Sequence, residues 1–201
     1  MTGRREESAR ESRRRLLEAA TELVAEGGPR AASVQAVADR AGISRGSVAW
    51  HFGSKEGLIV EVIGQAFRSA EEEYRRVLPE SGPLTFDALL DAHLSVVDAS
   101  CGRVFATVLP EVMGGPGPLR DAYVKGYEGT RRVWVGYLER ITAGTPGLPD
   151  AKSLASLVFG SGVGVNTLHG LDGLVDRAEA FAALRTLFEL AGGGPAPDAR
   201  A

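Results

Sequence analysis

The residues best suited to chemistry in this sequence lie close together between Ser33 and Lys55, in a stretch that reads SVQAVADRAGISRGSVAWHFGSK. Near its centre Arg45 follows Ser44, and Trp50 and His51 come one to two helical turns later. Arginine can donate two parallel hydrogen bonds to a guanine edge, and hydroxyl groups and other side-chain donors can bind phosphate oxygens. These residue types, at this spacing, indicate recognition of a polar surface rather than bond-breaking chemistry.

Two short helices joined by a tight turn are expected to position these side chains. Apolar residues recur at helical spacing in the first helix, at Val34, Val37 and Ala38. Ser33 stands where an N-cap belongs, and Gly42 is expected to end this helix in the left-handed conformation. Ser44 is expected to cap the second helix, which runs to Phe52. The apolar residues that can pack inward there are Ile43, Val48 and Phe52. The pair fits a helix-turn-helix unit, whose second helix enters the major groove of DNA, although an ordinary helical hairpin fits this pattern too.

A dense motif runs through the second helix and beyond it. Its residues are Ala38, Ala41, Gly42, Ile43, Ser44, Gly46, His51, Phe52, Ser54, Lys55, Glu56 and Leu58, in the spacing A-x2-AGIS-x-G-x4-HF-x-SKE-x-L. Over residues 10 to 65 the chain resembles the TetR family of one-component transcriptional regulators. The resemblance implies that double-stranded DNA is contacted by Ser33, Gln35, Ser44, Arg45, Gly46, Ser47, Trp50, His51 and Lys55. Arg45 is expected to read bases, and the others to position the protein mostly through phosphates. One position departs from the family pattern, because Ala49 stands where a tyrosine usually contacts phosphate.

Charge is distributed unevenly along the chain. The net charge is −3, yet residues 1–60 hold 10 Arg or Lys and 8 Asp or Glu, against 13 and 18 in residues 61–201. A mildly basic head on an acidic body suits a DNA-reading domain joined to one that avoids DNA. Six arginines gather near the start, at positions 4, 5, 10, 13, 14 and 15. They form either a solvated charged helix face or an arm that touches phosphate or the minor groove.

Patterns typical of an enzyme are missing from the sequence. The three histidines, His51, His93 and His169, lie far apart, and Cys101 has no histidine beside it. No HExxH, phosphate loop or dinucleotide fingerprint occurs. We therefore expect no catalytic residues, no metal and no cofactor. The single cysteine and the lack of a long apolar run or signal peptide favour a cytoplasmic protein with no membrane partner.

Helical periodicity continues to the end of the chain, so an all-α fold is expected. A first helix is predicted from Glu11 to Glu26 after a frayed stretch over residues 1–9, with Gly27, Gly28 and Pro29 as its stop. A long helix is predicted from Ser54 to Leu78, with Ser54 as its N-cap. Later helices are predicted over residues 85–100, 103–113, 117–143, 150–170 and 176–191. The predicted breaks are Gly102, two turns rich in glycine and proline (114–118 and 143–150) and a glycine-containing turn (170–173).

The helices of the second half could hold a small molecule. The residues predicted to line an apolar pocket with a few polar contacts are Phe105, Leu109, Met113, Tyr123, Tyr127, Trp134, Asn166 and His169. Plain core packing is the alternative for each of them, and His93 is a further candidate polar contact. Three glycines, Gly160, Gly162 and Gly164, stand inside one predicted helix, where each costs about 0.5–1 kcal/mol relative to alanine. This helix and the last one resemble the family's two-helix dimer face.

The sequence thus predicts a helix-turn-helix DNA-binding domain over residues 1–53 and a helical effector-binding and dimerisation domain over 54–201. The second domain includes a linking helix (54–78) and a disordered tail (192–201). The function predicted is a ligand-responsive transcriptional regulator, most simply a repressor, that binds a palindromic operator as a homodimer and is released by a small apolar or amphipathic effector. The alternative is a helical ligand-binding or protein-interaction dimer with weakened DNA binding, which rests on Ala49.

Overall fold

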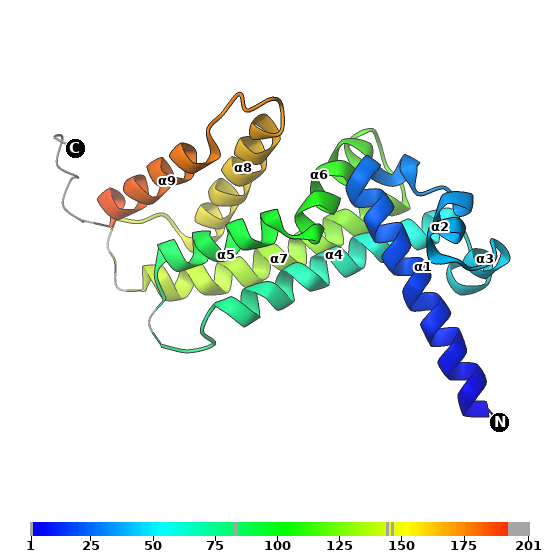
Figure 1. Ribbon diagram of the computed structural model, residues 1–201. Helices are drawn as coiled ribbons and strands as arrows, with labels where there is room; N and C mark the ends of the chain where they lie inside the picture. The colour runs from blue at the N-terminus through cyan, green and yellow to red at the C-terminus, as the bar shows by residue number, and fades with distance from the viewer. Residues whose placement is uncertain (1, 83, 144, 146, 193–201) are drawn as a thin grey trace. The chain divides into compact units, whose positions relative to one another are not determined.

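The computed structural model describes residues 2–82, 84–143, 145 and 147–192 (Figure 1). Over these residues the chain is helical, with no strand, and the predicted all-α fold is confirmed. The helices are α1 (Thr2–Ala31), α2 (Val34–Ala41), α3 (Gly46–Phe52), α4 (Lys55–Val77), α5 (Phe86–Asp98), α6 (Ser100–Met113), α7 (Pro118–Thr142), α8 (Ala151–His169) and α9 (Arg177–Ala191). Among the described helices, none has both the length and the apolar composition that crossing a bilayer requires.

The helix ends of the DNA-binding motif follow local chemistry. The Ser33 hydroxyl accepts a hydrogen bond from the Ala36 amide at 3.1 Å and caps α2. Gly42 ends α2 with a positive φ of 63°, a conformation that glycine adopts without strain. The Ser54 hydroxyl accepts from the Gly57 amide at 3.0 Å at the start of α4. These three predicted caps are confirmed.

Three sequence expectations on helix ends are wrong. Helix α1 already begins at Thr2, so the stretch described before Glu11 is helical rather than frayed. It consists largely of good helix formers, and Arg14 continues the charged face through ion pairs with Glu11 and Glu18. Ser44 does not cap an amide of α3, because its hydroxyl lies 3.0 Å from the Ser47 hydroxyl and the N-cap position belongs to Arg45.

The third error concerns Gly102, which lies in the first turn of α6 and does not end a helix. The break falls instead at Ala99, between α5 and α6. A Cβ at Gly102 would lie 2.1 Å from the Val97 carbonyl oxygen. Glycine is therefore needed at this position for the close approach of two consecutive helices, not as a helix stop.

By packing, the chain divides into two compact units. Unit 1 comprises Met1–Glu73 and Ser95–Glu128, and unit 2 comprises Tyr74–Leu94 and Gly129–Ala201. The division falls within α4, α5 and α7, each of which contributes residues to both units. The predicted functional boundary between residues 53 and 54 is a different division and stays a prediction. The predicted disordered tail lies, except for Gly192, outside the described residues.

Unit 1 is built on the contact of α1 with α6. Gly27 and Gly28 interrupt the helical backbone of α1, as expected for the predicted stop, and Gly28 has a φ of 73°. The Thr107 hydroxyl donates to the Val24 carbonyl at 2.7 Å, and a Cβ at Gly28 would meet the Thr107 carbonyl oxygen at 3.2 Å. These contacts fix the C-terminal end of α1, from which the chain continues into α2 and the DNA-binding motif.

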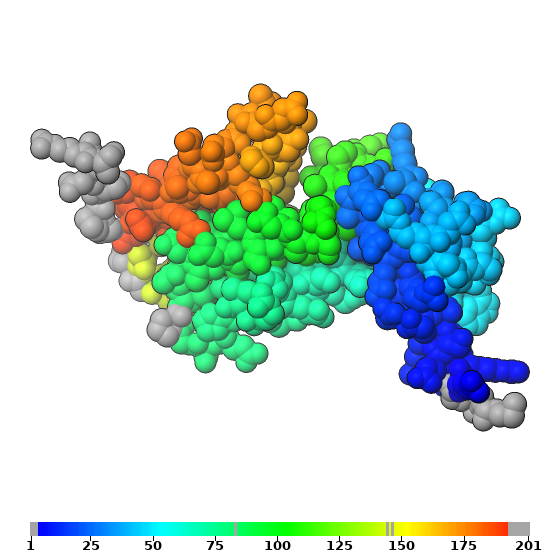
Figure 2. All heavy atoms as spheres, viewed as in Figure 1, coloured from blue at the N-terminus to red at the C-terminus, as the bar shows by residue number. Residues whose placement is uncertain are grey.

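Unit 2 is built from the end of α4, most of α5, the second half of α7, and α8 and α9. Phe86 and Phe188 stack with ring centroids 3.8 Å apart, which joins α5 to α9. Arg185 of α9 forms ion pairs with Asp87 and Asp91 of α5. The surface of α8 and α9, gold to red in Figure 2, includes exposed apolar side chains, among them Leu157, Val163, Leu168, Leu187 and Leu190.

Candidate nucleic-acid interface and effector site

The nine residues predicted to contact DNA lie in α2, in α3, at the first residue of α4 and in the turns around them, and none is fully buried. On α3, Val48 is buried, whereas Arg45 at its N-cap and Trp50 are exposed, Trp50 by 72%. Ser47, His51 and Lys55 are half-buried. The helix thus packs by one face and offers the other to a partner. The roles of these residues toward DNA stay predictions.

Two arginines of α1 hold the motif in place. The Arg13 guanidinium lies 5.0 Å from the centre of the Phe52 ring at the end of α3, and its Nη2 lies 3.4 Å from a carboxylate oxygen of Glu61. Arg15 donates to the Ala41 carbonyl at the end of α2, where a cation also complements the helix dipole. Sequence reasoning treated these arginines as part of a charged face or a DNA-binding arm and missed their positioning contacts. No local signal distinguishes them from Arg14, which pairs within α1.

Short-range polar contacts order the exposed side of the motif. The Gln35 amide nitrogen donates to an Asp39 carboxylate oxygen at 2.6 Å. The rings of Trp50 and His51 meet edge to face with centroids 4.3 Å apart. Burial, and secondarily the charge of Arg13, lower the pKa of His51, which favours its neutral form at neutral pH. Neutral imidazole can still donate one hydrogen bond to a phosphate oxygen.

Three of the residues predicted to line an effector pocket, Phe105, Tyr123 and Trp134, lie in two separate aromatic clusters. In unit 1, Phe105 and Tyr123 both contact Phe67, with ring centroids 4.5 Å and 5.2 Å away. Burial raises the pKa of Tyr123 to about 12, so its hydroxyl stays protonated. Gly126 allows this packing, because a Cβ there would lie 2.1 Å from a Phe67 ring carbon.

The second cluster lies in unit 2 and includes Trp134, which is fully buried. Its ring is perpendicular to the rings of His93 and Tyr74, with centroids 5.3 Å and 5.9 Å away. His93 Nδ1 and the Tyr74 hydroxyl are hydrogen bonded at 3.0 Å. Burial lowers the pKa of His93 to about 4, so the imidazole is neutral at neutral pH.

The remaining predicted pocket residues have varied surroundings. Leu109 and Tyr127 are half-buried. Asn166 donates from Nδ2 to the Gly162 carbonyl one turn earlier in α8, at 2.8 Å. Met113 is 75% exposed, and His169 is exposed with Nδ1 3.1 Å from the Val175 carbonyl oxygen. Met113 and His169 thus belong to neither aromatic cluster, and a ligand-binding role for any of these residues stays a prediction.

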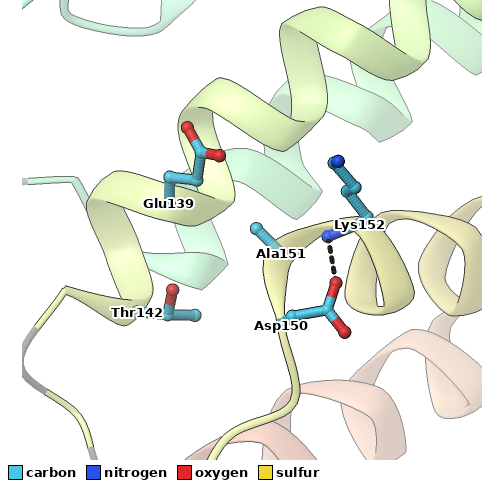
Figure 3. Close-up of a pocket in the computed structure, with 5 residues that line it drawn as sticks. All are labelled: Glu139, Thr142, Asp150, Ala151 and Lys152. Carbon is cyan, nitrogen blue, oxygen red and sulfur yellow. Dashed lines mark hydrogen bonds between the residues drawn. The ribbon is translucent and has the colours of Figure 1, made fainter.

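A pocket of about 410 Å³ lies where the end of α7 meets the start of α8 (Figure 3). It is lined by Glu139, Thr142, Asp150, Ala151 and Lys152. Asp150 is already engaged, because its carboxylate caps α8 by accepting from the Lys152 and Ser153 amides at 3.0 Å. None of the predicted effector residues lines this pocket, and four of its five lining residues are polar or charged, unlike the mostly apolar set that the sequence predicts.

Comparison with known proteins finds similarity in the DNA-binding region. The family model described as "Bacterial regulatory proteins, tetR family" matches residues 16–62, which include α2, α3 and the start of α4. The HTH-type transcriptional repressor KstR2 of Rhodococcus jostii (strain RHA1) is 33% identical over 130 residues. The match spans 63% of this chain and 63% of that relative.

Solved structures share the fold over nearly the whole chain. A TetR-family transcriptional regulator from Agrobacterium tumefaciens superposes with a TM-score of 0.73 at 22% identity, covering 90% of this chain and 98% of that one. The transcriptional regulator FadR from Bacillus subtilis, solved in complex with stearoyl-CoA, superposes with a TM-score of 0.67 at 20% identity, covering 90% and 98%. The motif, its supporting contacts and these similarities agree: residues 16–62 resemble the DNA-binding region of the tetR family of bacterial regulatory proteins, and the fold is the one that solved TetR-family regulators share.

Proposed function

We propose that this protein is a transcriptional repressor that binds a palindromic operator as a homodimer and releases it when a small amphipathic effector binds. The observation that carries the proposal is the exposed face of α3, whose other face is buried at Val48 and contacted by Arg13 at Phe52, while Arg15 holds the end of α2. A short helix anchored on one face and open on the other is the form in which a helix-turn-helix enters the major groove. The relative from Rhodococcus jostii carries the name of a repressor.

Within this face Arg45 and Lys55 have distinct roles. Arg45 stands exposed at the N-terminal end of α3, the end that meets base edges in helix-turn-helix complexes. There a guanidinium can bond guanine bidentately. Lys55 is the first residue of α4, beside backbone amides that point out of the helix start. A lysine near such amides favours a phosphate.

Dimerisation through α8 and α9 follows from their exposed apolar side chains. Leu157 and Leu187 are more than half exposed in the single chain, and burying them against a second copy would remove apolar surface from water. Cβ atoms built at Gly160 and Gly164 meet nothing within 4 Å, so these glycines leave room for another helix. A two-fold dimer would set two α3 helices toward successive major grooves, roughly 34–36 Å apart.

Release by an effector requires that the effector bind the two states of the dimer with different affinity. The aromatic clusters around Phe67 and around His93 offer apolar surroundings with a few polar groups, which is the usual composition of a small-molecule site. FadR from Bacillus subtilis, which has a similar fold, was solved with the amphipathic molecule stearoyl-CoA.

The experiment that tests the proposal is selection of bound DNA from a random pool, read at two salt concentrations. A repressor of this kind enriches a palindrome with steep salt dependence, because several phosphates are neutralised at once. Arg45→Ala is expected to weaken binding by about 1–3 kcal/mol and to relax one operator position. Arg132→Ala, the same change at an exposed residue of α7 in unit 2, serves as the control.

One result would change the role assigned to Arg45, and another would contradict the proposed function. An equal loss of affinity for all sequences in Arg45→Ala would make Arg45 a phosphate contact instead of a base reader. No enrichment by a folded dimer would favour the second candidate, a ligand-binding dimer with weakened DNA binding. The exposed Ala49, in place of the usual tyrosine, is the observation that supports this second candidate.

A further inference from the structure

Unit 2 contains buried polar atoms that its own core does not satisfy. Among the described residues, no hydrogen-bond partner is available to His93 Nε2, Thr130 Oγ1, Trp134 Nε1 or Asn166 Oδ1. The side chains of His93, Thr130 and Trp134 are among the most deeply buried of the unit, with exposed fractions of 7%, 4% and 0%. A buried polar atom without a partner costs about 1–3 kcal/mol, so several such atoms together require an explanation.

These four residues, which we call the buried polar cluster, are neighbours. Thr130 and Trp134 are one turn apart on α7. Trp134 meets the His93 ring edge to face at 5.3 Å. His93 Nε2 points to Gly162, where a built Cβ would lie only 2.8 Å away, and the Gly162 carbonyl accepts from Asn166. The cluster therefore runs without interruption from α7 through α5 to α8.

The hydrogen-bonding capacity of the cluster defines what can bind it. Trp134 Nε1 can only donate, so its partner must be an acceptor. When the Tyr74 hydroxyl donates to His93 Nδ1, the proton of the neutral imidazole sits on Nε2, which then also needs an acceptor. Thr130 can donate as well. Each of these donors therefore lacks an acceptor, which an oxygen atom can supply, whereas Asn166 Oδ1 is itself an acceptor that a hydroxyl group can satisfy.

The residues around the buried polar cluster determine whether its partner can be charged and whether the rest of the partner is polar or apolar. The rings of Phe159 and Phe181 lie 5.8 Å and 6.2 Å from His93, and the cluster itself includes no lysine or arginine. A carboxylate placed there would lose its hydration without gaining a cation, at a penalty of several kcal/mol. An uncharged oxygen on an apolar body suits both the donors and the aromatic walls.

We propose that the buried polar cluster recognises the effector through an uncharged oxygen acceptor, a ketone or a hydroxyl, carried on an apolar body. This inference rests on the proposed function, since it names the chemistry of the effector. An oxygen that reaches His93 Nε2 must displace the α8 backbone at Gly162, which now occupies that space. Binding would thereby shift α8, and α8 carries the proposed dimer face.

The test follows the indole N–H resonance of Trp134 by nitrogen-15 NMR of the full chain. The protein has two tryptophans, and Trp50→Phe leaves Trp134 as the only indole signal. The probes are cyclohexanone, methylenecyclohexane, in which CH2 replaces the oxygen, and cyclohexanecarboxylate. Cyclohexanone is expected to move the signal downfield with saturation and to bind about tenfold tighter than methylenecyclohexane, the value of about one to two hydrogen bonds. Equal binding of the hydrocarbon, preference for the carboxylate, or a signal that no probe moves would each overturn the inference.

A pair of threonine variants locates the interaction. Thr130→Val keeps the shape of a buried side chain but removes its hydroxyl, and it is expected to weaken cyclohexanone binding about three- to tenfold with methylenecyclohexane binding unchanged. Thr167→Val makes the same change at an exposed position of α8 and is expected to leave both affinities unchanged. Equal effects of the two variants would place the site elsewhere.

The selected operator separates failure of this inference from failure of the proposed function. If the dimer binds an operator but no probe shifts the Trp134 signal, the proposed function stands and the inference about the effector is wrong. If a dimer binds cyclohexanone but selects no operator, the ligand site stands and the proposed repressor function is wrong.

Discussion

The protonation of His93 is expected to make the stability of unit 2 depend on pH. Burial lowers the pKa of His93 to about 4 in the folded chain, from an ordinary value of 6.5 that applies once the chain unfolds. Between these two pKa values His93 is protonated in the unfolded chain but neutral in the folded chain, so folding becomes less favourable as the pH falls. The stabilisation is complete above pH 6.5 and is lost progressively toward pH 4.

The size of the effect follows from the two pKa values. Integrating over one titrating group gives a loss of about 2 kcal/mol between pH 7.5 and pH 5, and about 3 kcal/mol once the pH is below 4. The free energy of unfolding should be measured by urea denaturation at pH 7.5, 6 and 5. The His93→Gln variant removes the titrating group but keeps a polar side chain of similar length.

Comparison of the two pH slopes isolates His93, because every carboxylate that also titrates near pH 5 is present in both proteins. The slope of the variant is expected to be flatter by about 2 kcal/mol over this interval, whatever its absolute stability. Equal slopes, or a histidine NMR titration that places the pKa of His93 near 6.5, would refute the reasoning. Either result would mean that His93 reaches water in solution.

Three further changes test packing and recognition. Gly126→Ala is expected to lower the free energy of unfolding by about 1–3 kcal/mol, because its Cβ would lie 2.1 Å from a carbon of the Phe67 ring. Gly136→Ala, in open space on the same helix, is expected to raise the free energy of unfolding by about 0.5–1 kcal/mol. Urea denaturation of both variants checks these values. Ala49→Tyr should tighten operator binding about fivefold by adding one phosphate hydrogen bond, as measured by titration of the selected operator. Gly164→Ala should leave the single chain unstrained but raise the dimer dissociation constant measured by sedimentation equilibrium, and an unchanged constant would place the dimer contact elsewhere.

The sequence predicted those parts of the fold that depend on neighbouring residues. Ser33, Gly42 and Ser54 act within one turn of their position, and their capping roles are confirmed. The prediction of a helix break at Gly102 is wrong because glycine is needed there for a close contact with Val97, where α6 follows α5. The beginning of α1 was misread because polarity was taken for disorder, although Arg, Glu and Ala are all good helix formers.

The sequence pattern did not separate the two aromatic clusters, for a geometric reason. Tyr123 and Trp134 lie on the same face of α7, and periodicity suggested that they line one wall. Eleven residues along a helix span about 16 Å, however, and each ring finds different neighbours. Tyr123 packs with Phe67 in unit 1, whereas Trp134 packs with His93 in unit 2. Periodicity identifies the buried face of a helix but not the residues that pack against it.

The three glycines of α8 show what the structure adds to such a pattern. Helical residues two positions apart point to nearly opposite sides, and those four apart point to the same side. Gly162 is buried and allows α8 to approach His93, whereas Gly160 and Gly164 face open space on the other side. Helix α8 therefore lacks side chains at positions on both of its faces, and each glycine lowers the stability of the helix by about 0.5–1 kcal/mol relative to alanine. Because a helix moves as a stiff rod, a ligand that pushes α8 away from His93 must also displace the outward face, where a second copy is proposed to pack. Under the proposed function, an effector bound beside His93 would therefore act directly on the contact between the two copies.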